Sequence, residues 1–306
     1  MNQILVTGGA GFIGQHLLKK LSKLNCEITL IDNLSNAHKD FQNTDISFHK
    51  RDIRNKDSIS DIFKGVKVDT CVHLAAKTSV SHSITNPFET FDINIKGTLN
   101  VLDACSNSRV DNFVFASSAA AYGEPKKLPI LEDHILDPIS PYGASKVAGE
   151  ILVSSYGKFG NIQNAISLRF FNVYGEGETL EYAGVITKFA ERLSKGLRPI
   201  IHGDGQQTRD FVSVNDVVNA IVLAMKSSSP AHHVFNIASG KSISINDLAK
   251  TMIRMSRLDL EPVYKKERKG DIKYTVADTT RAKKTLGFTA KDELEHGLKQ
   301  LILNLD

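Results

Sequence analysis

The sequence predicts an α/β protein built on a doubly wound parallel (Rossmann) sheet, with a smaller, mixed α/β part toward the carboxyl end. Short apolar runs alternate with amphipathic helical patterns through the first half of the 306 residues. That alternation is typical of parallel strands with helices on both faces of the sheet. After Gly175 the pattern loosens. We expect the later residues to cap the carboxyl ends of the strands, where open α/β sheets bind their ligands.

Each element of the sheet has its own signal in the sequence. Short runs of apolar residues predict strands over residues 4–6, 28–31, 68–74, 113–115 and 165–171. Apolar residues at helical spacing predict helices over 12–24, 88–105, 141–156 and 214–225. The third of these helices has Pro141 at its start, where the missing N–H costs little.

A glycine-rich turn, TGGAGFIG at residues 7–14, joins the first strand to the first helix. Glycines here allow a tight turn, a close backbone approach to a pyrophosphate, and close packing of helix on strand. The pyrophosphate would then sit on the free N–H groups at the start of the helix. The second strand ends in Asp32, whose carboxylate suits the two ribose hydroxyls of an adenosine and repels a 2′-phosphate. The sequence therefore predicts NAD rather than NADP.

This prediction sets the expected domain organisation. Residues 1–174 are predicted to form an NAD-binding Rossmann domain, to which residues 208–235 return. Residues 175–207 and 236–306 are predicted to form mainly the substrate-binding part.

Composition and charge favour an ordinary globular protein that acts on a small molecule. The formal net charge is +4 and the basic residues are scattered, which argues against nucleic acid and fits an anionic substrate. The three cysteines lie far apart, without disulfide or metal-ligand spacing, and no histidine pair has such spacing, so no metal is predicted. We see no signal peptide and no apolar run near the ~20 residues that span a bilayer. We therefore expect a cytoplasmic protein with no membrane partner.

A candidate catalytic group lies at residues 142–146, YGASK, where a helix places Tyr142 and Lys146 on one face. A cation at ~4 Å contributes up to ~4 kcal/mol at an effective dielectric of 20, enough to lower the pKa of the phenol by at most ~3 from its usual value near 10. An oxidised nicotinamide would add a second positive charge. The phenolate could then remove a proton from a substrate hydroxyl. Ser118, at the end of a predicted strand, could share the same substrate oxygen.

Taken together, these motifs resemble the NAD-dependent epimerase/dehydratase family, the extended short-chain dehydrogenase/reductases, and among them most of all the UDP-sugar 4-epimerases. The resemblance runs nearly from end to end. It rests on the glycine turn, on the Tyr-Lys motif, and on the segments DNLS (32–35), DI (52–53), HLAA (73–76), NIKGT (94–98), SSAAAYG (117–123), RFFNVYG (169–175), GDGQQTRDFV (203–212) and RKGD (268–271).

The resemblance implies roles for individual residues. Asp52 and Ile53 would flank the adenine, Ala75 and Ala76 would line the path of the cofactor, and Lys146 would also hold the nicotinamide ribose. The expected cofactor set is completed by Tyr142 together with Gly8, Gly11, Phe12, Ile13, Gly14, Asp32, Asn33, Leu74 and Asn94. The expected substrate contacts are Ser79, Ser118, Asn172, Arg209, Arg268, Asp271 and Thr275. Arginine suits a diphosphate because its guanidinium binds phosphate oxygens in pairs.

Two departures from the family pattern narrow the expected reaction. The family's dehydratases carry an Asp-Glu pair where this chain has Ala119 and Ala120, and its decarboxylases carry Glu at the second place. The remaining chemistry is reversible oxidation at C4 of a UDP-hexose, through a transient 4-keto sugar, on tightly bound NAD. Another nucleotide-sugar epimerase or a reductase of the family remains an alternative. ADP-heptose 6-epimerases share the alanine-rich segment but favour NADP, against which Asp32 argues. A non-catalytic NAD-binding sensor is the alternative from another class.

Two further expectations concern substrate range and assembly. In the family, the residue four places after the counterpart of Asp271 gates the sugar pocket, and here it is Thr275. A small residue there admits an N-acetyl group, so UDP-N-acetylhexosamines are expected beside UDP-glucose and UDP-galactose unless Tyr274 takes over the gate. The helices over 88–105 and 141–156 are expected to pair with their copies in a homodimer, as is common in the family, although a monomer core also explains their apolar faces.

Overall fold

A seven-stranded sheet forms the centre of the computed structural model, which describes residues 2–37, 46–178, 184–227, 233–267 and 272–303. The strand order is β10-β6-β5-β4-β1-β2-β3, and every pair is parallel. This sheet confirms the predicted doubly wound fold. Its strands are β1 (Asn2–Thr7), β2 (Cys26–Asp32), β3 (Ser47–Lys50), β4 (Thr70–His73), β5 (Asn112–Ser118), β6 (Asn164–Phe170) and β10 (His233–Ile237).

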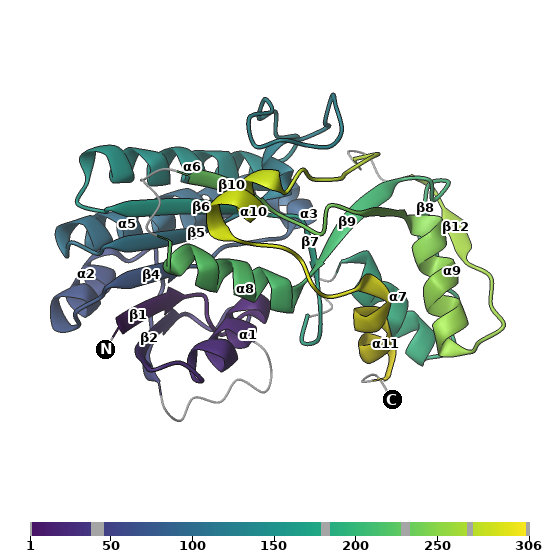
Figure 1. Cartoon of the computed structure of the whole chain (residues 1–306), viewed down its shortest axis with the longest axis horizontal. Helices are drawn as coiled ribbons and strands as arrows, with labels where there is room; N and C mark the ends of the chain where they lie inside the picture. The colour runs from purple at the N-terminus through teal and green to yellow at the C-terminus, as the bar shows by residue number, and fades with distance from the viewer. Residues whose placement is uncertain (1, 38–45, 179–183, 228–232, 268–271, 304–306) are drawn as a thin grey trace.

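Helices cover both faces of the sheet, and an apolar core fills the space under each layer (Figure 1). On one face lie α1 (Phe12–Leu21), α8 (Val214–Met225) and α10 (Thr280–Leu286). On the other face lie α2 (Lys56–Gly65), α5 (Thr98–Asn107) and α6 (Pro141–Phe159). The strands of the middle of the sheet are buried on both sides, which explains their nearly continuous apolar sequences.

The long helix predicted over residues 88–105 is divided in the structure. It consists of α4 (Pro87–Phe91), a π-helical stretch η1 (Asp92–Gly97) and α5. Gly97 lies directly on Ile53, because a Cβ at this position would come within 2.5 Å of the Ile53 side chain. The wider π turn lies beside the candidate site, and π turns inside helices are often found there. The short α3 (Val80–Thr85) comes just before it.

A second, smaller group of elements follows β6 and lies at the right of Figure 1. Helices α7 (Val185–Ser194), α9 (Ile245–Ser256) and α11 (Leu294–Leu303) share an apolar core there. Two small sheets accompany them, and their orders are β11-β9-β7 and β12-β8. The strands are β7 (Asn172–Tyr174), β8 (Ile200–His202), β9 (Thr208–Ser213), β11 (Ser242–Ser244) and β12 (Val263–Lys265).

The two groups are interleaved along the chain. Strand β10 pairs with β6 in the central sheet, and α10 packs against β10 and α8. Residues late in the sequence therefore return to the sheet. The proposed domain boundaries themselves stay a prediction.

The direction of chain winding reverses between β1 and β4, which are neighbours in the sheet although β2 and β3 separate them in sequence. Thr7 is level with His73, and His73 is level with Phe115. The carboxyl ends of β1, β4 and β5 therefore meet at one edge. In open α/β sheets a crevice for ligands forms at this reversal point.

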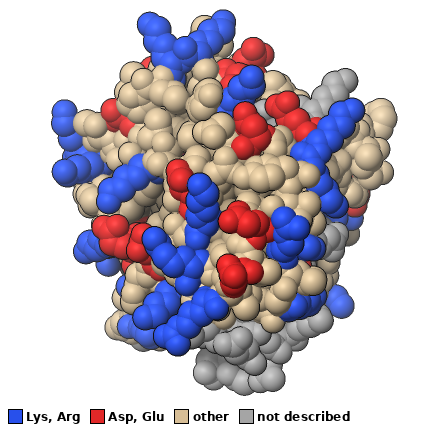
Figure 2. Space-filling model, turned by 90° about the vertical axis from the view of Figure 1, so that its right-hand side faces the viewer, with Lys and Arg blue, Asp and Glu red and all other residues tan. Residues whose placement is uncertain are grey.

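Charged side chains of both signs are interspersed on the face shown in Figure 2, which looks onto the smaller group of elements. Arginines and lysines alternate there with aspartates and glutamates instead of forming a single basic field. Among the described residues, no helix is long and apolar enough to cross a membrane.

Candidate active site

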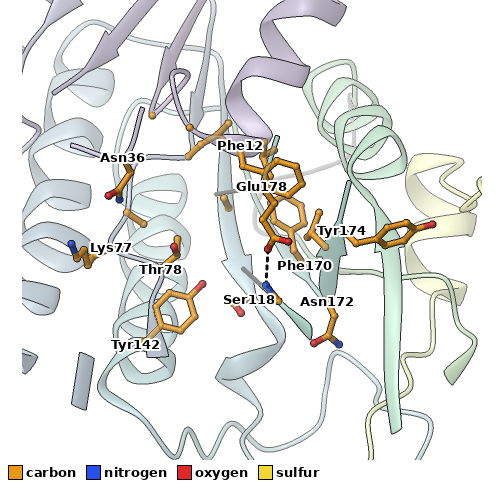
Figure 3. A pocket seen from close by; sticks show the side chains of 18 of the residues that line it. Phe12, Asn36, Lys77, Thr78, Ser118, Tyr142, Phe170, Asn172, Tyr174 and Glu178 are labelled. Atoms are coloured by element: carbon orange, nitrogen blue, oxygen red, sulfur yellow. Dashed lines mark hydrogen bonds between the residues drawn. The ribbon is translucent and has the colours of Figure 1, made fainter. Parts of the chain in front are cut away.

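A cavity of about 610 Å³ opens at the carboxyl ends of β1, β4 and β5 and continues to α7, β8 and β9. Its walls come from both groups of elements. Tyr142 and Thr78 project from one side, while Phe12, Phe170 and Glu178 stand across from them (Figure 3). Residues of the parallel sheet and its helices line one part of the cavity, which we call the sheet half. Residues of β7, α7, β8, β9 and the loop between β7 and α7 line the other part, which we call the small-sheet half.

The glycine turn forms one end of the sheet half. Gly8 has a φ of +73°, and a Cβ there would lie 2.5 Å from the backbone nitrogen of Ala75. Only glycine fits a backbone that is both left-handed and so close to another chain segment. The predicted cofactor residues Gly11, Phe12, Ile13 and Gly14 line the cavity at the start of α1, where free N–H groups favour a bound phosphate.

Asp32, at the end of β2, also faces this end of the cavity. Its carboxylate accepts hydrogen bonds from the backbone N–H of Ala10 at 3.0 Å and of Leu34 at 2.7 Å. Burial raises the pKa of this carboxyl group, and the two backbone hydrogen bonds act in the opposite direction. Asp32 therefore braces the glycine turn as well as presenting a negative edge to the cavity.

The neighbouring residues Asn33, Asp52 and Ile53 also line the cavity. Asp52 pairs with Arg54 at 2.7 Å and accepts a hydrogen bond from the side chain of Asn33 at 3.1 Å. The Arg54 guanidinium holds the pKa of Asp52 at about 2. Asp52 is thus an acceptor across the neutral range, and its place beside the adenine stays a prediction.

The end of β4 is held by a buried chain of hydrogen bonds. His73 lies between the hydroxyls of Thr7, at 2.6 Å from Nδ1, and Thr98, at 2.9 Å from Nε2. Thr98 donates its own proton to the carbonyl of Asn94, so the Nε2–H of His73 donates to Thr98, and Nδ1 accepts from Thr7. Burial lowers the pKa of His73 to about 3. The histidine is a neutral connector between strands and not a base.

Leu74, Ala75 and Ala76 follow β4 and line the cavity as predicted. Asn94 does not reach it: its amide bonds the backbone of Lys77, at 2.7 and 3.0 Å, and the hydroxyl of Ser145, at 2.9 Å. Ser79 caps the start of α3 by accepting from the N–H of His82 at 3.1 Å. Neither side chain belongs to the cavity wall, and both position the loop that follows β4.

The predicted catalytic residues meet where the two halves join. Ser118 ends β5, Tyr142 and Lys146 lie one turn apart on α6, and all three line the cavity. A Cβ at Gly143 would come within 2.5 Å of the carbonyl oxygen of Ala120. Glycine at this position therefore lets α6 approach the short turn η2 (Ala119–Ala121) that follows Ser118.

Burial dominates the electrostatics of this group. Burial raises the pKa of Tyr142, and a hydrogen bond with Ser118 opposes the rise. Lys146 donates to the carbonyl of Ala116 at 2.8 Å, with its Nζ 5.8 Å from the centroid of the Tyr142 ring. Desolvation of the phenol thus outweighs any lowering of its pKa by Lys146, and the lowering predicted for Lys146 together with an oxidised nicotinamide stays a prediction. Burial also lowers the pKa of Lys146, to about 8.

In the small-sheet half, the predicted residues Asn172 and Arg209 line the cavity. Asp210 is fully buried, and its carboxylate accepts from Ser239, Gly240 and Ala277, at 2.7 to 3.1 Å. Asn172 donates to the carbonyl of Asp210 at 2.9 Å. Asp210 thus fixes the strand that presents Arg209, instead of forming a surface ion pair with it.

Thr275, predicted to gate the sugar pocket, is buried against β9. Its N–H and hydroxyl donate to the carbonyl of Thr208 at 3.2 and 3.3 Å, and it does not belong to the cavity wall. Tyr274 beside it is about half exposed, at 48%. Arg268 and Asp271, the other two predicted substrate residues, lie outside the described residues.

Several residues of the cavity wall were missed by the sequence analysis. Glu178 lines the cavity and accepts hydrogen bonds from the N–H of Gly184, at 3.0 Å, and from the hydroxyl of Thr187. Burial raises the pKa of Glu178, and these two hydrogen bonds, with the charge of Lys188, oppose the rise. No motif marks these residues, which reach the cavity only through folding. The same holds for Thr78, Phe189, Ile201 and His202. Gln207 and Phe211 also line the cavity, and they lie within the segment 203–212, in which the sequence analysis gave a role to Arg209 alone.

The site fits a dinucleotide, because a glycine cradle, a helix start and an acid at the second strand end lie on one wall. Within the described residues, no group of three His, Cys, Asp or Glu side chains is arranged to hold a metal ion. Fold and site thus define a nicotinamide-dinucleotide-dependent enzyme of the short-chain dehydrogenase type.

Comparison with known proteins carries the assignment further. Residues 4–238 match the model of the NAD dependent epimerase/dehydratase family. A protein of Methanocaldococcus jannaschii named putative UDP-glucose 4-epimerase is 40% identical over 302 residues, covering 98% of this chain and 97% of that protein. The UDP-glucose 4-epimerase of Thermotoga maritima, solved with UDP-glucose, has a TM-score of 0.94 at 38% identity, with 98% of this chain and 97% of that chain covered.

A second solved structure widens the range of sugars among similar proteins. The UDP-N-acetylglucosamine 4-epimerase of Methanobrevibacter ruminantium M1, in complex with UDP-N-acetylmuramic acid, has a TM-score of 0.92 at 33% identity, covering 99% of this chain and 97% of that chain. The chain belongs to the NAD-dependent epimerase/dehydratase family. It is an enzyme of the epimerase type, and NAD is its cofactor.

Proposed function

We propose that this enzyme epimerises a UDP-hexose at C4 through a transient 4-keto sugar. The observation that carries the proposal is the meeting of Ser118, Tyr142 and Lys146 where the two halves of one cavity join. A reacting sugar held there lies between a dinucleotide on the sheet half and a nucleotide on the small-sheet half. The names of the similar proteins support UDP as that nucleotide.

The residues of the chain handle the proton. Tyr142, as the phenolate, removes the proton of the 4-hydroxyl, and Ser118 hydrogen-bonds the same oxygen. Bound NAD would supply the acceptor and donor for the C4 hydride and, in its oxidised form, a positive charge near Tyr142. Lys146, as the ammonium, stabilises the phenolate electrostatically. After the keto sugar turns over, Tyr142 returns its proton and the cycle leaves the enzyme unchanged.

The absence of elimination chemistry supports epimerisation over dehydration. Ala119 and Ala120 occupy η2, directly after Ser118, and carry no acid. Three carboxylates belong to the described cavity wall, those of Asp32, Asp52 and Glu178, and each accepts hydrogen bonds from the protein. Carboxylates engaged in this way are poorly placed to drive the loss of water.

Arg209 is the strongest candidate in the small-sheet half for a diphosphate contact. It lies on β9, which Asp210 anchors from behind through its four hydrogen bonds. A guanidinium binds two phosphate oxygens at once, and such charged hydrogen bonds are worth about 1.5–3 kcal/mol. Arg268 and Asp271 remain proposed partners, on the strength of the family resemblance.

For the sugar itself, we propose that UDP-N-acetylhexosamines are accepted beside UDP-glucose and UDP-galactose. A threonine at position 275 leaves more space than a tyrosine would, and a similar solved protein is named for an N-acetylated substrate. Thr275 is hydrogen-bonded to β9 behind the cavity wall and does not contact the cavity itself. It would affect the sugar by leaving space into which the wall residues can move.

We also propose that the enzyme is a homodimer joined through the helices around α4 and α6. Large apolar side chains are exposed there: Phe88 is 88% exposed, Phe159 is 72% exposed, and Ile84 and Ile151 are each 61% exposed. A monomer rarely leaves so many apolar side chains in water on neighbouring helices. Light scattering should give twice the chain mass for the wild type and a monomer for Phe88→Glu. A wild-type monomer contradicts this proposal.

The test of the function uses the purified enzyme with UDP-galactose or UDP-N-acetylgalactosamine, without added NAD. The anomeric proton signals in NMR spectra report conversion to the gluco isomers. Conversion of both sugars supports C4 epimerisation with retained cofactor and the wider sugar range, whereas conversion of UDP-galactose alone rejects the wider range. No conversion, even after NAD is added, rejects the UDP-hexose assignment. Net production or consumption of NADH would indicate a reductase.

A further inference from the structure

A buried ion pair lies directly behind the catalytic turn of α6. Glu150 follows Lys146 by four residues, as Lys146 follows Tyr142, so the three side chains lie along one face of the helix. Glu150 is 6% exposed. Arg169 of β6 binds both of its carboxylate oxygens, with Nε at 2.9 Å from Oε1 and Nη2 at 2.6 Å from Oε2. Arg169 is 3% exposed. The pair is therefore out of contact with water.

The same carboxylate reaches the strand that carries Ser118. The hydroxyl of Ser117 donates to Glu150 at 2.5 Å, and Ser117 is the residue immediately before Ser118 in β5. Arg169 in turn donates to the hydroxyl of Tyr122 at 2.7 Å and to the carbonyl of Glu132 at 2.9 Å. Glu150 thus joins the catalytic helix to the ends of two strands.

Such a pair adds little to stability by itself. Removing two charges from water costs about as much as their attraction returns, and apolar side chains of similar size often serve a fold equally well. Its position next to Lys146 suggests another use. Lys146 is buried as an ammonium beside the ring of Phe115, with a single described carbonyl, that of Ala116, as its hydrogen-bond acceptor.

The charges around Lys146 can be named element by element. On α6 itself it faces Tyr142 and Glu150, and on β4 it faces His73, which is neutral at ordinary pH. On β6 the charge is that of Arg169, which is bonded to Glu150. Among the described groups, Glu150 therefore supplies the negative charge that opposes the cost of burying the ammonium.

Resting on the proposed function, in which Lys146 acts as a cation, we propose that Glu150 is a positioning residue for the reaction. Its charge keeps Lys146 an ammonium at the pH values at which the enzyme works, and its bond to Ser117 aligns the strand end that bears Ser118.

The experiment measures the protonation of Lys146 directly in the NAD-loaded enzyme. Lysine side chains are labelled with ¹³C and ¹⁵N, the Lys146 signal is identified from its loss in Lys146→Arg, and its titration is followed by NMR. In Glu150→Gln the midpoint should fall by about one pH unit or more, the usual effect of losing a neighbouring opposite charge. The alkaline limb of the epimerisation rate should move down by the same amount. An unchanged midpoint overturns the proposal.

Two matched variants separate charge from contact. Ser117→Ala removes the hydrogen bond and no charge, so the turnover rate should fall while the Lys146 midpoint stays. Asp103→Asn removes an acid from α5 instead of α6, and both quantities should stay as in the wild type. A shift in the midpoint as large in Asp103→Asn as in Glu150→Gln would also overturn the proposal.

Because Glu150→Gln leaves the Arg169 guanidinium buried without its anion, the double variant Glu150→Gln, Arg169→Met is measured beside it. A lowered midpoint in either folded protein supports the proposal. Failure of both to fold assigns the pair a structural role only and overturns it. A wild-type enzyme that converts no UDP-sugar rejects the proposed function instead, and the NMR midpoints still decide the role of Glu150.

Discussion

The two halves of the cavity are built in different ways. In the sheet half, the residues lie at the ends of neighbouring strands of one continuous sheet and are tied together by buried hydrogen bonds such as Thr7–His73–Thr98. In the small-sheet half, the carboxylate of Asp210 on β9 binds the loops that carry Ser239, Gly240 and Ala277, and helix α7 packs against an apolar core shared with α9 and α11. The buried hydrogen bonds of the sheet half hold its residues in one arrangement, which suits a site for a cofactor that stays the same in every reaction. The small-sheet half is a local assembly in which single substitutions can change the accepted substrate.

Among the substitutions considered, the loss of the Tyr142 hydroxyl should lower the epimerisation rate most. Tyr142→Phe removes the only group assigned to take the substrate proton, so we expect the epimerisation rate to fall about 10²- to 10⁴-fold. Bound NAD, measured after denaturing the protein, should change far less. Tyr156→Phe, on the same helix, is the control and should keep its activity. A fully active Tyr142→Phe enzyme would remove Tyr142 from its proposed role.

Arg209 tests whether the small-sheet half holds the sugar nucleotide and leaves the cofactor alone. Arg209→Met should raise the KM for the UDP-sugar about 10- to 150-fold, since a charged hydrogen bond is worth about 1.5–3 kcal/mol. The amount of bound NAD should stay the same. Lys241→Met, which removes an exposed cation just before β11, the strand paired with β9, controls for net charge. If Arg209→Met weakened the binding of NAD as much as that of the UDP-sugar, the two halves of the cavity would not bind the two ligands independently.

A substitution at Thr275 tests whether the small-sheet half decides if a sugar with an N-acetyl group is accepted. Thr275→Tyr should lower the rate with the N-acetylated sugar relative to UDP-galactose by roughly tenfold, because a steric change in a pocket discriminates by about 1–3 kcal/mol. Thr275→Val, which removes the hydroxyl hydrogen bond to Thr208 but keeps the N–H bond and the side-chain volume, serves as control. An equal loss of rate with the N-acetylated sugar and with UDP-galactose would contradict a role of residue 275 in selecting the sugar.

The buried histidine of the sheet half makes that half sensitive to acid. The pKa of His73 is about 3 in the fold and 6.5 in its ordinary state. Below pH 6.5 the unfolded chain takes up a proton that the folded chain does not bind, so stability falls as the pH drops toward 3. This residue changes the free energy of unfolding by at most about 1.4 kcal/mol per pH unit.

Denaturant unfolding between pH 7 and pH 5 measures this slope. His73→Asn should be less stable than the wild type at pH 7 but less dependent on pH. His296→Asn, on the exposed side of α11, should retain the full pH dependence of the wild type. A His73→Asn protein with the slope of the wild type would exclude His73 as the source.

Local motifs explain which parts of the site were predictable. Residues 7–14 and 142–146 are short segments whose chemistry depends on neighbours in sequence. The structure places Gly8, residues 11–14, Tyr142 and Lys146 on the cavity wall. Asn94 was recognisable as part of a motif, but its amide turned out to hold Lys77. A motif shows that a residue matters more reliably than it shows which group the residue touches.

The residues that sequence reasoning missed come from no motif at all. Glu178 and Lys188 reach the cavity because α7 and the loop before it fold back toward the sheet. The raised pKa of Tyr142 was also beyond prediction, because it depends on how much water the fold excludes.

The sequence by itself determined the doubly wound sheet and the cofactor, because hydrophobic periodicity and glycine turns act over a few residues, and it predicted the catalytic trio. Only the tertiary structure decided that Asp210 anchors β9 and that His73 joins β1 to α5. It also decided that Glu150 and Arg169 face each other behind Lys146. These contacts join residues from 19 to 67 positions apart. Their strength comes from burial, which the order of the residues alone does not reveal.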